Sequence, residues 1–450
     1  KKREITPLGK ITIIKSLLVS KLTYLFLNLP DPPAPYLKEL EQTLYHFLWG
    51  SKIHRIRKTV VCKSYENGGL KMCDVHSFIS AMKISWLRRL EHDSSSAHFI
   101  LKMYPILANL HKFGGEYANI IMQRIHNPFW HDVAKHYRLL CTKLVLSDSP
   151  EFFAEPIHYN ANILIDRHVV YIKEWVDNGV VQIKDLFNDV TGDLFTFKEF
   201  QTKYSMVART NFMLYEGIRH SIKHYLHRMG VELVSGNSAV DSSVWCCIHR
   251  GNQSVRSVFT EDGNLPTAAV KWNTMYDGLD WKGIYLKCFK TTGDVQLKWF
   301  QARLLHRILP TGKYLHMCKI VDSPSCKFCT DGTETIDHLF WKCHIVQQFW
   351  QDLLLQLHTK CAHCDRFVFG EQLVLFGMAQ QVVTDKALDF IILYAKFFIY
   401  KCKLAETMPT VQIFLHQLRH RYRIEAQSVL LGKRLEFQQL WVPYTPLFED

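Results

Sequence analysis

Four side chains in the stretch SCKFCTDGTETIDHLFWKC have the types and the spacing of a zinc site. They are Cys326, Cys329, His338 and Cys343, in the pattern Cys-x2-Cys-x8-His-x4-Cys. Structural zinc takes four nitrogen or sulfur donors in a tetrahedron, and a Cys-x-x-Cys pair commonly supplies two of them. All four positions are filled, which leaves no place for a catalytic water and indicates a structural metal. The alternative is a set of unrelated reduced cysteines in a core.

A second cysteine pair follows the first motif. Cys361 and Cys364 have His358 and His363 nearby, but no matching second pair lies downstream. The sequence therefore leaves open whether this pair binds a second metal.

The cysteine count also bears on the compartment. Thirteen cysteines is an odd number, and they lack the regular short spacing of a disulfide scaffold. We therefore expect a reducing, intracellular environment in the cytoplasm and nucleus. The N-terminal segment KKREITPLGK is charged and then helical, so we expect no signal peptide. The longest apolar runs are interrupted by Lys21, Asp389 and Lys396, so we expect no membrane partner.

The chain is basic, and its charge is uneven. The 450 residues carry a net charge of +13, and residues 1–90 alone hold 16 Lys or Arg against 6 Asp or Glu. Concentrated positive charge favours a polyanion such as nucleic acid. Hydrophobic residues make up 48% of the chain, which is enough for folded cores.

Apolar periodicity predicts a mainly α fold with several units, a small structural zinc unit and few short strands. Helices are expected from Pro7, from Pro35 to Gly50, over Val75–Leu90, near Phe212–Leu226 and over Ala387–Lys403, with a final basic helix over 416–441. A few short strands near 53–72 and 180–200 would be compatible with this pattern. The expected division is 1–95, 96–235, a linker at 236–266, 267–345 and 346–450.

Basic side chains that could contact phosphates gather in two places. The first set lies on the first helix and in the following loop SKIHRIRK, and the second lies just before the zinc motif, one helical turn apart. The candidates are Lys10, Lys15, Lys21, Lys52, Arg55, Arg57, Lys58, Arg303 and Arg307. Taken singly, each is more often a solvated surface charge than a contact.

Several collinear stretches carry a resemblance. They are TPLGKITIIKSLLVSKLTYLF, FLWGSKIHRIRK, ENGGLKMCDVHSFISAMKISWLRRL, WFQARLLHRILPTGKYLHMCKI and the zinc motif itself. Together they resemble the region after the polymerase palm in LINE-type (non-LTR) retrotransposon reverse transcriptases. The resemblance implies a helical thumb-like region at 1–95, followed later by that family's zinc-binding domain.

The chemistry of such an enzyme is not encoded in these residues. A reverse transcriptase holds two Mg²⁺ ions with paired palm aspartates, and no Asp-Asp dipeptide occurs in the chain. Magnesium is expected only where that palm is present. A zinc deaminase is also disfavoured, because no His-x-Glu occurs and Ser325 precedes Cys326.

The sequence thus predicts a non-catalytic segment with no small-molecule substrate. The resemblance implies that it holds template RNA and primer or target DNA during target-primed reverse transcription. The competing interpretation is a domesticated or degenerate fragment, in which zinc braces a structural or protein-interaction module.

Overall fold

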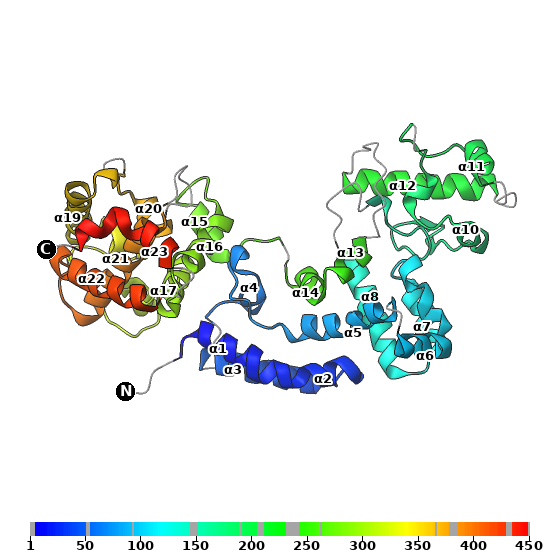
Figure 1. The fold of residues 1–450 in the computed structure, drawn as a ribbon, viewed down its shortest axis with the longest axis horizontal. Coiled ribbons are helices and arrows are strands. Elements are labelled where there is room, and N and C mark those ends of the chain that lie inside the picture. The colour runs from blue at the N-terminus through cyan, green and yellow to red at the C-terminus, as the bar shows by residue number, and fades with distance from the viewer. Residues whose placement is uncertain are drawn as a thin grey trace. The chain divides into compact units, whose positions relative to one another are not determined.

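The computed structural model describes residues 5–50, 55–91, 94–144, 152–188, 191–204, 211–230, 243–261, 263–364, 367–377, 385–428 and 434–448. It is 69% helical, with two short strands among the described residues, so the predicted mainly α class is confirmed. Figure 1 shows short helices and connecting loops along almost the whole chain.

Two compact units are each built from separated segments of the chain. Unit 1 comprises Lys1–Ile13, Tyr45–Met72 and Gly263–Asp450, and unit 2 comprises Ile14–Leu44 and Cys73–Asp262. The five-part division expected from the sequence stays a prediction. In the stretch 236–266, residues 236–242 and 262 lie outside the described part, and α13 (Ser243–His249) and α14 (Asn252–Thr260) occupy much of the rest.

The first helix begins at Pro7, as predicted. It runs as α1 (Pro7–Ile13), the π-helical η1 (Ile14–Val19) and α2 (Ser20–Asn28). The Thr6 hydroxyl accepts a hydrogen bond from the Gly9 amide at 3.3 Å and so caps the first turn. The next helix, α3 (Ala34–Trp49), ends at Gly50, whose φ of 66° is the left-handed conformation that glycine adopts without strain.

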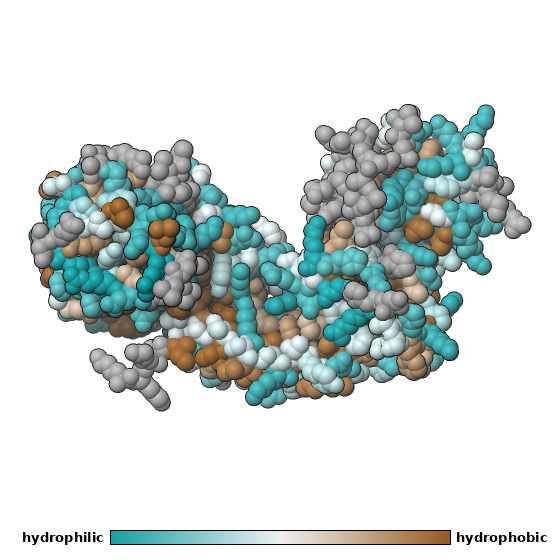
Figure 2. Space-filling view, viewed as in Figure 1, coloured by the Kyte–Doolittle hydropathy of each residue, from teal (hydrophilic) through white to brown (hydrophobic). Residues whose placement is uncertain are grey.

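Unit 1 packs its helices around α21 (Lys386–Ala405), most of whose side chains are buried. Two indoles at its centre have their N–H groups satisfied: Trp272 donates to Leu305 O at 2.9 Å, and Trp350 donates to Phe340 O at 2.8 Å. Hydrophilic side chains cover most of the visible surface around α19 and α22 (Figure 2).

The other elements of unit 1 follow in chain order. They are α4 (Lys58–Cys62), η2 (Tyr65–Asn67), α15 (Thr267–Asn273), α16 (Trp281–Thr291), α17 (Val295–Leu305), α18 (Gly312–Met317), η5 (His338–Lys342), α19 (His344–Lys360), η6 (Ala362–Cys364), α20 (Glu371–Phe376), α22 (Val411–Ser428), α23 (Arg434–Trp441) and η9 (Val442–Leu447). The basic helix expected over 416–441 is divided between α22 and α23, and residues 429–433 between them lie outside the described part.

Two hydrophobic cores of unit 2 lie within the part of the chain that the structure describes. One lies among the helices from α5 to α8 together with α13 and α14, and the other lies around α12. Its elements are α5 (Val75–Glu91), α6 (Ser95–Met103), η3 (Pro105–Lys112), α7 (Tyr117–Arg124), α8 (Pro128–Lys143), β1 (Leu164–Ile165), β2 (His168–Val169), α10 (Lys173–Asp177), η4 (Ile183–Leu186), α11 (Phe197–Lys203), α12 (Phe212–Met229), α13 and α14.

The expected positions of the strands were wrong for the residues that the structure describes. The two strands pair antiparallel at 164–169. Among the described residues near 53–72, α4 and η2 form instead, and α4 buries Val60 and Val61. Near 180–200 only isolated bridges occur, including Phe187 with Leu194.

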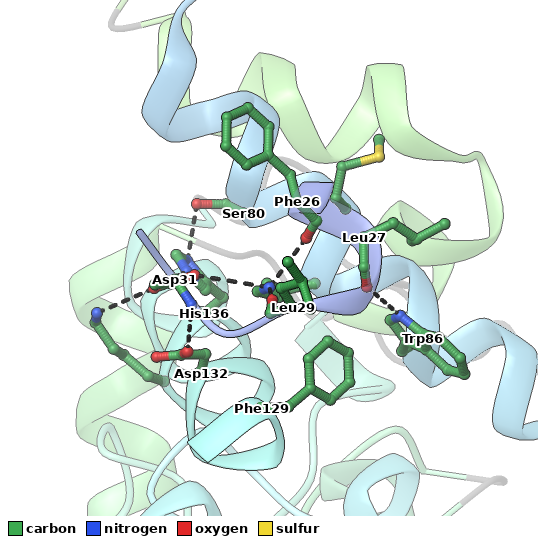
Figure 3. Close-up of polar contacts among 12 residues, drawn as sticks. Phe26, Leu27, Leu29, Asp31, Ser80, Trp86, Phe129, Asp132 and His136 are labelled. Carbon is green, nitrogen blue, oxygen red and sulfur yellow. Dashed lines mark hydrogen bonds and ion pairs between the residues drawn. The ribbon is translucent and has the colours of Figure 1, made fainter. Parts of the chain in front are cut away.

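Buried side chains of α5 hold the C-terminal end of α2 in unit 2. The Lys83 ammonium, which is 0% exposed, donates to Phe26 O at 2.9 Å and also to Leu29 O. The Trp86 indole donates to Leu27 O at 2.7 Å. These donors satisfy carbonyls that a helix end leaves unpaired, and a cation is favourable there (Figure 3).

The turn after α2 is held by a cluster around Asp31. Its carboxylate accepts a hydrogen bond from His136 Nε2 at 2.9 Å and pairs with Lys135 at 3.3 Å, and its own amide donates to Asp132 at 2.6 Å. Lys83 Nζ lies 4.0 Å from the same carboxylate (Figure 3). Burial raises the pKa of Asp31, but the hydrogen bonds and charges of His136 and Lys135 lower it by more, so the pKa falls from 3.8 to about 2. Asp31, Lys83, Lys135 and His136 are called the Asp31 cluster below.

One described helical segment satisfies a length and composition criterion for crossing a membrane. It is Pro7–Asn28, with 22 residues. Core helices of soluble proteins and signal sequences satisfy the same criterion, so the segment carries no conclusion about a membrane.

Candidate metal centre

The loop between α18 and η5 brings the four predicted zinc donors together. One donor atom from each of Cys326, Cys329, His338 and Cys343 lies within 4.8 Å of the others. Cys326 Sγ and Cys343 Sγ are 4.0 Å apart, and Cys329 Sγ and His338 Nε2 are 3.3 Å apart. A tetrahedral zinc ion places two sulfurs roughly 3.8 Å apart and a sulfur and a nitrogen roughly 3.6 Å apart. The donor set therefore fits zinc in both chemistry and size.

A short backbone bridge shapes the first half of this loop. Ser325 pairs with Thr333, and the Cys326 amide donates to Gly332 O at 2.8 Å. Gly332 also lies against the imidazole, where an added Cβ would come within 3.0 Å of His338 Cε1. The absence of a side chain at Gly332 lets the loop close over the histidine ligand.

A π-helical turn shapes the second half. η5 (His338–Lys342) is followed by a hydrogen bond from the Cys343 amide to His338 O at 2.9 Å, which joins residues five apart. An α-helix would rotate a residue five positions on away from its partner, whereas the wider π turn returns it to the same side. This turn explains how a His-x4-Cys spacing presents both donors to one ion.

Backbone and thiol hydrogen bonds polarise two of the sulfurs. The Phe328 amide points at Cys326 Sγ at 3.4 Å. The hydrogen bond between Cys326 and Cys343 raises the pKa of the Cys326 thiol and lowers the pKa of the Cys343 thiol. Zinc replaces such thiol protons when it binds, because the thiolate is the ligand.

A buried ion pair that the sequence did not reveal braces the loop. Glu334 is fully buried and pairs with Lys403 of α21 at 2.9 Å. The Glu334 carboxylate also accepts from the Gly312 amide at 2.7 Å, and Lys403 donates to Pro310 O at 2.7 Å. The pair thus connects the zinc loop to the turn before α18 and to the central helix of unit 1. Lys403 lies too far along the chain for spacing to have indicated this partnership.

The second cysteine pair does not join a metal-binding group among the described residues. Cys361 and Cys364 are both buried, and burial raises the pKa of each thiol, that of Cys364 to about 12. His363 Nε2 lies 3.5 Å from Cys364 Sγ, whereas His358 Nε2 bonds to Phe367 O at 3.1 Å. His358 is therefore turned toward the backbone rather than toward the thiols.

Residues 271–350 match the family described as zinc-binding in reverse transcriptase. The four donors lie inside this match. The match supports a reverse-transcriptase-associated zinc-binding module and a retroelement reverse transcriptase region. A Cys3His cluster within it is consistent with structural Zn²⁺.

Two of the candidate cations, Arg303 and Arg55, repel each other electrostatically in unit 1. Arg303 projects from α17 with its guanidinium 5.9 Å from the Trp299 ring and 5.8 Å from the Tyr400 ring. Burial lowers the pKa of Arg303, and the positive charge of the exposed Arg55 lowers it further. Arg303 Nε is buried without a hydrogen-bond partner within the described residues.

Arg307 does not share this position. α17 ends at Leu305, and Arg307 follows in a left-handed conformation with φ 55°, so it is not one helical turn from Arg303 on a common face. Its guanidinium lies 4.3 Å from the Trp272 ring. The neighbouring His306 is buried and bonds to Gly68 O at 2.8 Å, and burial lowers its pKa to about 4.

The remaining candidates are dispersed. In unit 1, Lys10 is half-buried and donates to Leu48 O at 3.4 Å, and Lys58 lies 4.9 Å from the Tyr45 ring. Arg57 is exposed just before α4. In unit 2, Lys15 and Lys21 are exposed. Lys52 lies outside the described residues.

A Ser-His-Asp chain in unit 2 does not have the arrangement of a nucleophile. Ser80 Oγ and His136 Nδ1 are 2.9 Å apart, and His136 Nε2 contacts Asp31. However, the Ser80 hydroxyl also donates to His76 O at 2.9 Å and lies within α5, where helical hydrogen bonds engage the backbone amides. The site therefore lacks free amides to stabilise an oxyanion.

Proposed function

We propose that this chain is a non-catalytic nucleic-acid-binding segment of a LINE-type retrotransposon reverse transcriptase. In this proposal it holds template RNA and primer or target DNA during target-primed reverse transcription, in the cytoplasm and nucleus. The zinc-binding match at 271–350 and the net charge of +13 support it. The zinc ion would brace the fold of unit 1 and do no chemistry itself, because four protein donors fill its coordination shell.

The observation that carries the proposal is the pair of arginines in unit 1. Arg55 is near enough to Arg303 to oppose its charge, and neither has an ion pair with a carboxylate among the described residues. Two guanidiniums that repel each other, one of them half-buried, make a positively charged site to which a phosphate group can bind. Aromatic rings beside Arg303 hold its guanidinium in place without neutralising it.

Such a site suits contact with a nucleic-acid backbone. A polymerase-associated segment must move along any sequence, and guanidinium–phosphate contacts position a strand without reading its bases. We therefore propose binding that depends weakly on sequence and strongly on salt.

Salt dependence tests this function. Affinity for a 20-base-pair RNA–DNA hybrid is measured by fluorescence anisotropy across a salt series, for the wild type and for R55Q/R303Q. Each phosphate contact with a duplex contributes a slope of about 0.9 in log affinity against log salt, so losing two contacts should reduce the slope by about 2. Cys326→Ser examined in parallel shows whether binding needs the zinc-braced fold.

The matched control is R423Q/R434Q, which removes the same charge from exposed positions on α22 and α23. It should retain most of the slope. A flat salt response of the wild type, or equal losses in the two double variants, would contradict the proposal. The first of these outcomes would favour the structural or protein-interaction module instead.

A further inference from the structure

A second group of possible metal ligands lies on the outside of the zinc loop. Cys329, Asp331 and His344 bring one sulfur, one carboxylate oxygen and one ring nitrogen within 4.8 Å of one another. Sulfur, imidazole and carboxylate are all ligands that zinc accepts. Cys329 belongs to this outer group and to the inner four-donor site.

The two groups differ in their access to solvent. Cys326 and Cys343 of the inner site are 1% and 0% exposed, so an ion held there is enclosed. Asp331 and His344 are exposed, and neither side chain forms a hydrogen bond or an ion pair with another described residue. Cys329, at 8% exposed, connects the enclosed site to these open side chains.

The backbone fixes this arrangement. Asp331 lies in the tight loop between Thr330, whose φ is 61°, and Gly332, which contacts the His338 ring. His344 is the first residue of α19, directly after the ligand Cys343. Both outer side chains are therefore anchored next to inner ligands and remain within reach of the shared sulfur.

We propose that Cys329, Asp331 and His344 form an outer site for Zn²⁺ that exchanges metal with the inner centre through the shared Cys329 thiolate. The incoming ion binds the Asp331 carboxylate, the neutral His344 imidazole and a second lone pair of the Cys329 sulfur. The inner ligands then transfer to it as the resident ion leaves. Each step exchanges one ligand for another, with no change of oxidation state and no net proton transfer.

Exchange through the outer site predicts how the rate of zinc exchange depends on free zinc. An enclosed ion that leaves only when the loop opens would exchange at a rate independent of free zinc. An ion displaced through an outer site exchanges faster as free zinc rises, because the incoming ion takes part in the step. The proposal therefore concerns exchange rate and leaves one tightly held zinc per chain at equilibrium.

Isotope exchange in the full, zinc-loaded chain tests it. Protein loaded with one stable zinc isotope is mixed with buffered free zinc of another, and the bound isotope ratio is followed by mass spectrometry. In the wild type the rate should rise with free zinc. In D331N/H344Q, which removes both outer ligands, the zinc-dependent rate should fall about tenfold, in keeping with the 10- to 100-fold effect of altering groups that support a metal site.

D322N/H316Q is the matched control. It makes the same chemical changes at exposed residues of the neighbouring segment that do not belong to either group. It should exchange like the wild type, and all three proteins should contain one zinc.

Three results would overturn the inference. They are a wild-type rate that does not depend on free zinc, an equal slowing in both double variants, and a chain that binds no zinc at all. Loss of the bound zinc in D331N/H344Q would overturn it as well, since those side chains would then be holding the resident ion. None of these results depends on nucleic-acid binding, so this test and that of the proposed function can fail separately.

Discussion

The zinc loop of unit 1 and the Asp31 cluster of unit 2 both fix an irregular stretch of chain, the first with metal ligands and the second with buried charges. Each holds an irregular stretch of chain against helices. In the zinc loop, three thiols and an imidazole from 18 consecutive residues, Cys326–Cys343, converge at 4.8 Å or less. In the Asp31 cluster, a carboxylate from a turn meets Lys83 of α5 and two residues of α8.

The two arrangements differ in what their stability requires. Metal bonds are strong and directional, so a short loop with little core of its own can be fixed by one ion. A buried ion cluster stabilises only while every charge retains its partners, because the desolvation cost of each charge remains when a partner is removed. The zinc loop should unfold on losing one ligand, whereas removing one partner from the Asp31 cluster should cost about 3 kcal/mol and leave the other contacts in place.

The largest expected effect is the loss of zinc. Cys326→Ser should lower bound zinc from one ion per chain to none and unfold the loop between α18 and η5, because binding and local folding are coupled. Metal analysis and hydrogen exchange over 312–343 measure both effects. Cys318→Ser, which changes an exposed cysteine outside the donor set, should retain the zinc. Retained zinc in Cys326→Ser would refute the ligand set.

Next in size is the removal of the buried ammonium from the Asp31 cluster. Lys83→Ala leaves the carbonyls of Phe26 and Leu29 without their cationic donor and should destabilise unit 2 by about 3 kcal/mol. Lys83→Met, which retains the packing, should cost less. Chemical unfolding together with hydrogen exchange in α2 measures both. Lys102→Ala, on the exposed face of α6, should change little; a comparable loss there would show that the effect is not specific to burial.

A smaller effect follows from the pKa of Asp31. Its folded value of about 2 lies below the usual 3.8, so the stabilisation is fully present above pH 4 and disappears as pH falls toward 2. The shift corresponds to about 2 kcal/mol. Asp31→Asn should therefore lower the free energy of unfolding at pH 6 and make little difference at pH 2. Asp193→Asn, an exposed aspartate of the same unit, provides the control; identical pH profiles for the two variants would contradict the assignment.

The smallest change in stability at high pH is expected at Lys396, a buried cation with no carboxylate in direct contact among the described residues. Its ammonium donates to Gln301 Oε1 at 2.8 Å and to Leu375 O at 3.0 Å, and burial lowers its pKa to about 7. Because its ordinary pKa is 10.5, the unfolded chain binds more protons between pH 7 and 10.5, and stability should rise with pH across that range.

Lys396→Met should remove this rise. At high pH the wild-type amine is already neutral, so the variant loses only its hydrogen bonds to Gln301 Oε1 and Leu375 O and should stay within about 1 kcal/mol of wild type. Urea unfolding at pH 6, 8 and 10 measures the slope. Lys386→Met, at an exposed position at the start of the same helix, should retain the wild-type slope. A wild-type slope in Lys396→Met would show that the proton uptake belongs to another group.

The two regions also differ in how far the sequence could predict them. The Cys-x2-Cys-x8-His-x4-Cys spacing indicated a zinc set because the donors are close along the chain, and the structure brings the same four atoms together. No pattern could join Asp31 to His136, because their contact depends on how α5 and α8 pack. The same holds for Glu334 and Lys403.

The basic residues also show how far the sequence could predict the arrangement of side chains. The charge of the sequence identified candidate nucleic-acid contacts, but their positions depend on where α17 ends. Because α17 ends at Leu305, Arg307 lies against the Trp272 ring, whereas Arg303 interacts electrostatically with Arg55. His306, expected beside them, is buried instead. Helix ends depend on tertiary contacts and are poorly fixed by periodicity alone.

The interleaving of the two units has a consequence for synthesis on the ribosome. All segments of unit 2 have been made once Asp262 is added, whereas unit 1 combines Lys1–Ile13 and Tyr45–Met72 with Gly263–Asp450. The two early segments of unit 1 therefore stay without their C-terminal partners, with apolar side chains uncovered, while Cys73–Asp262 of unit 2 is translated. Closing contacts between such distant segments is slow. The nascent chain thus passes through a stage in which these segments lack the part of unit 1 against which they pack.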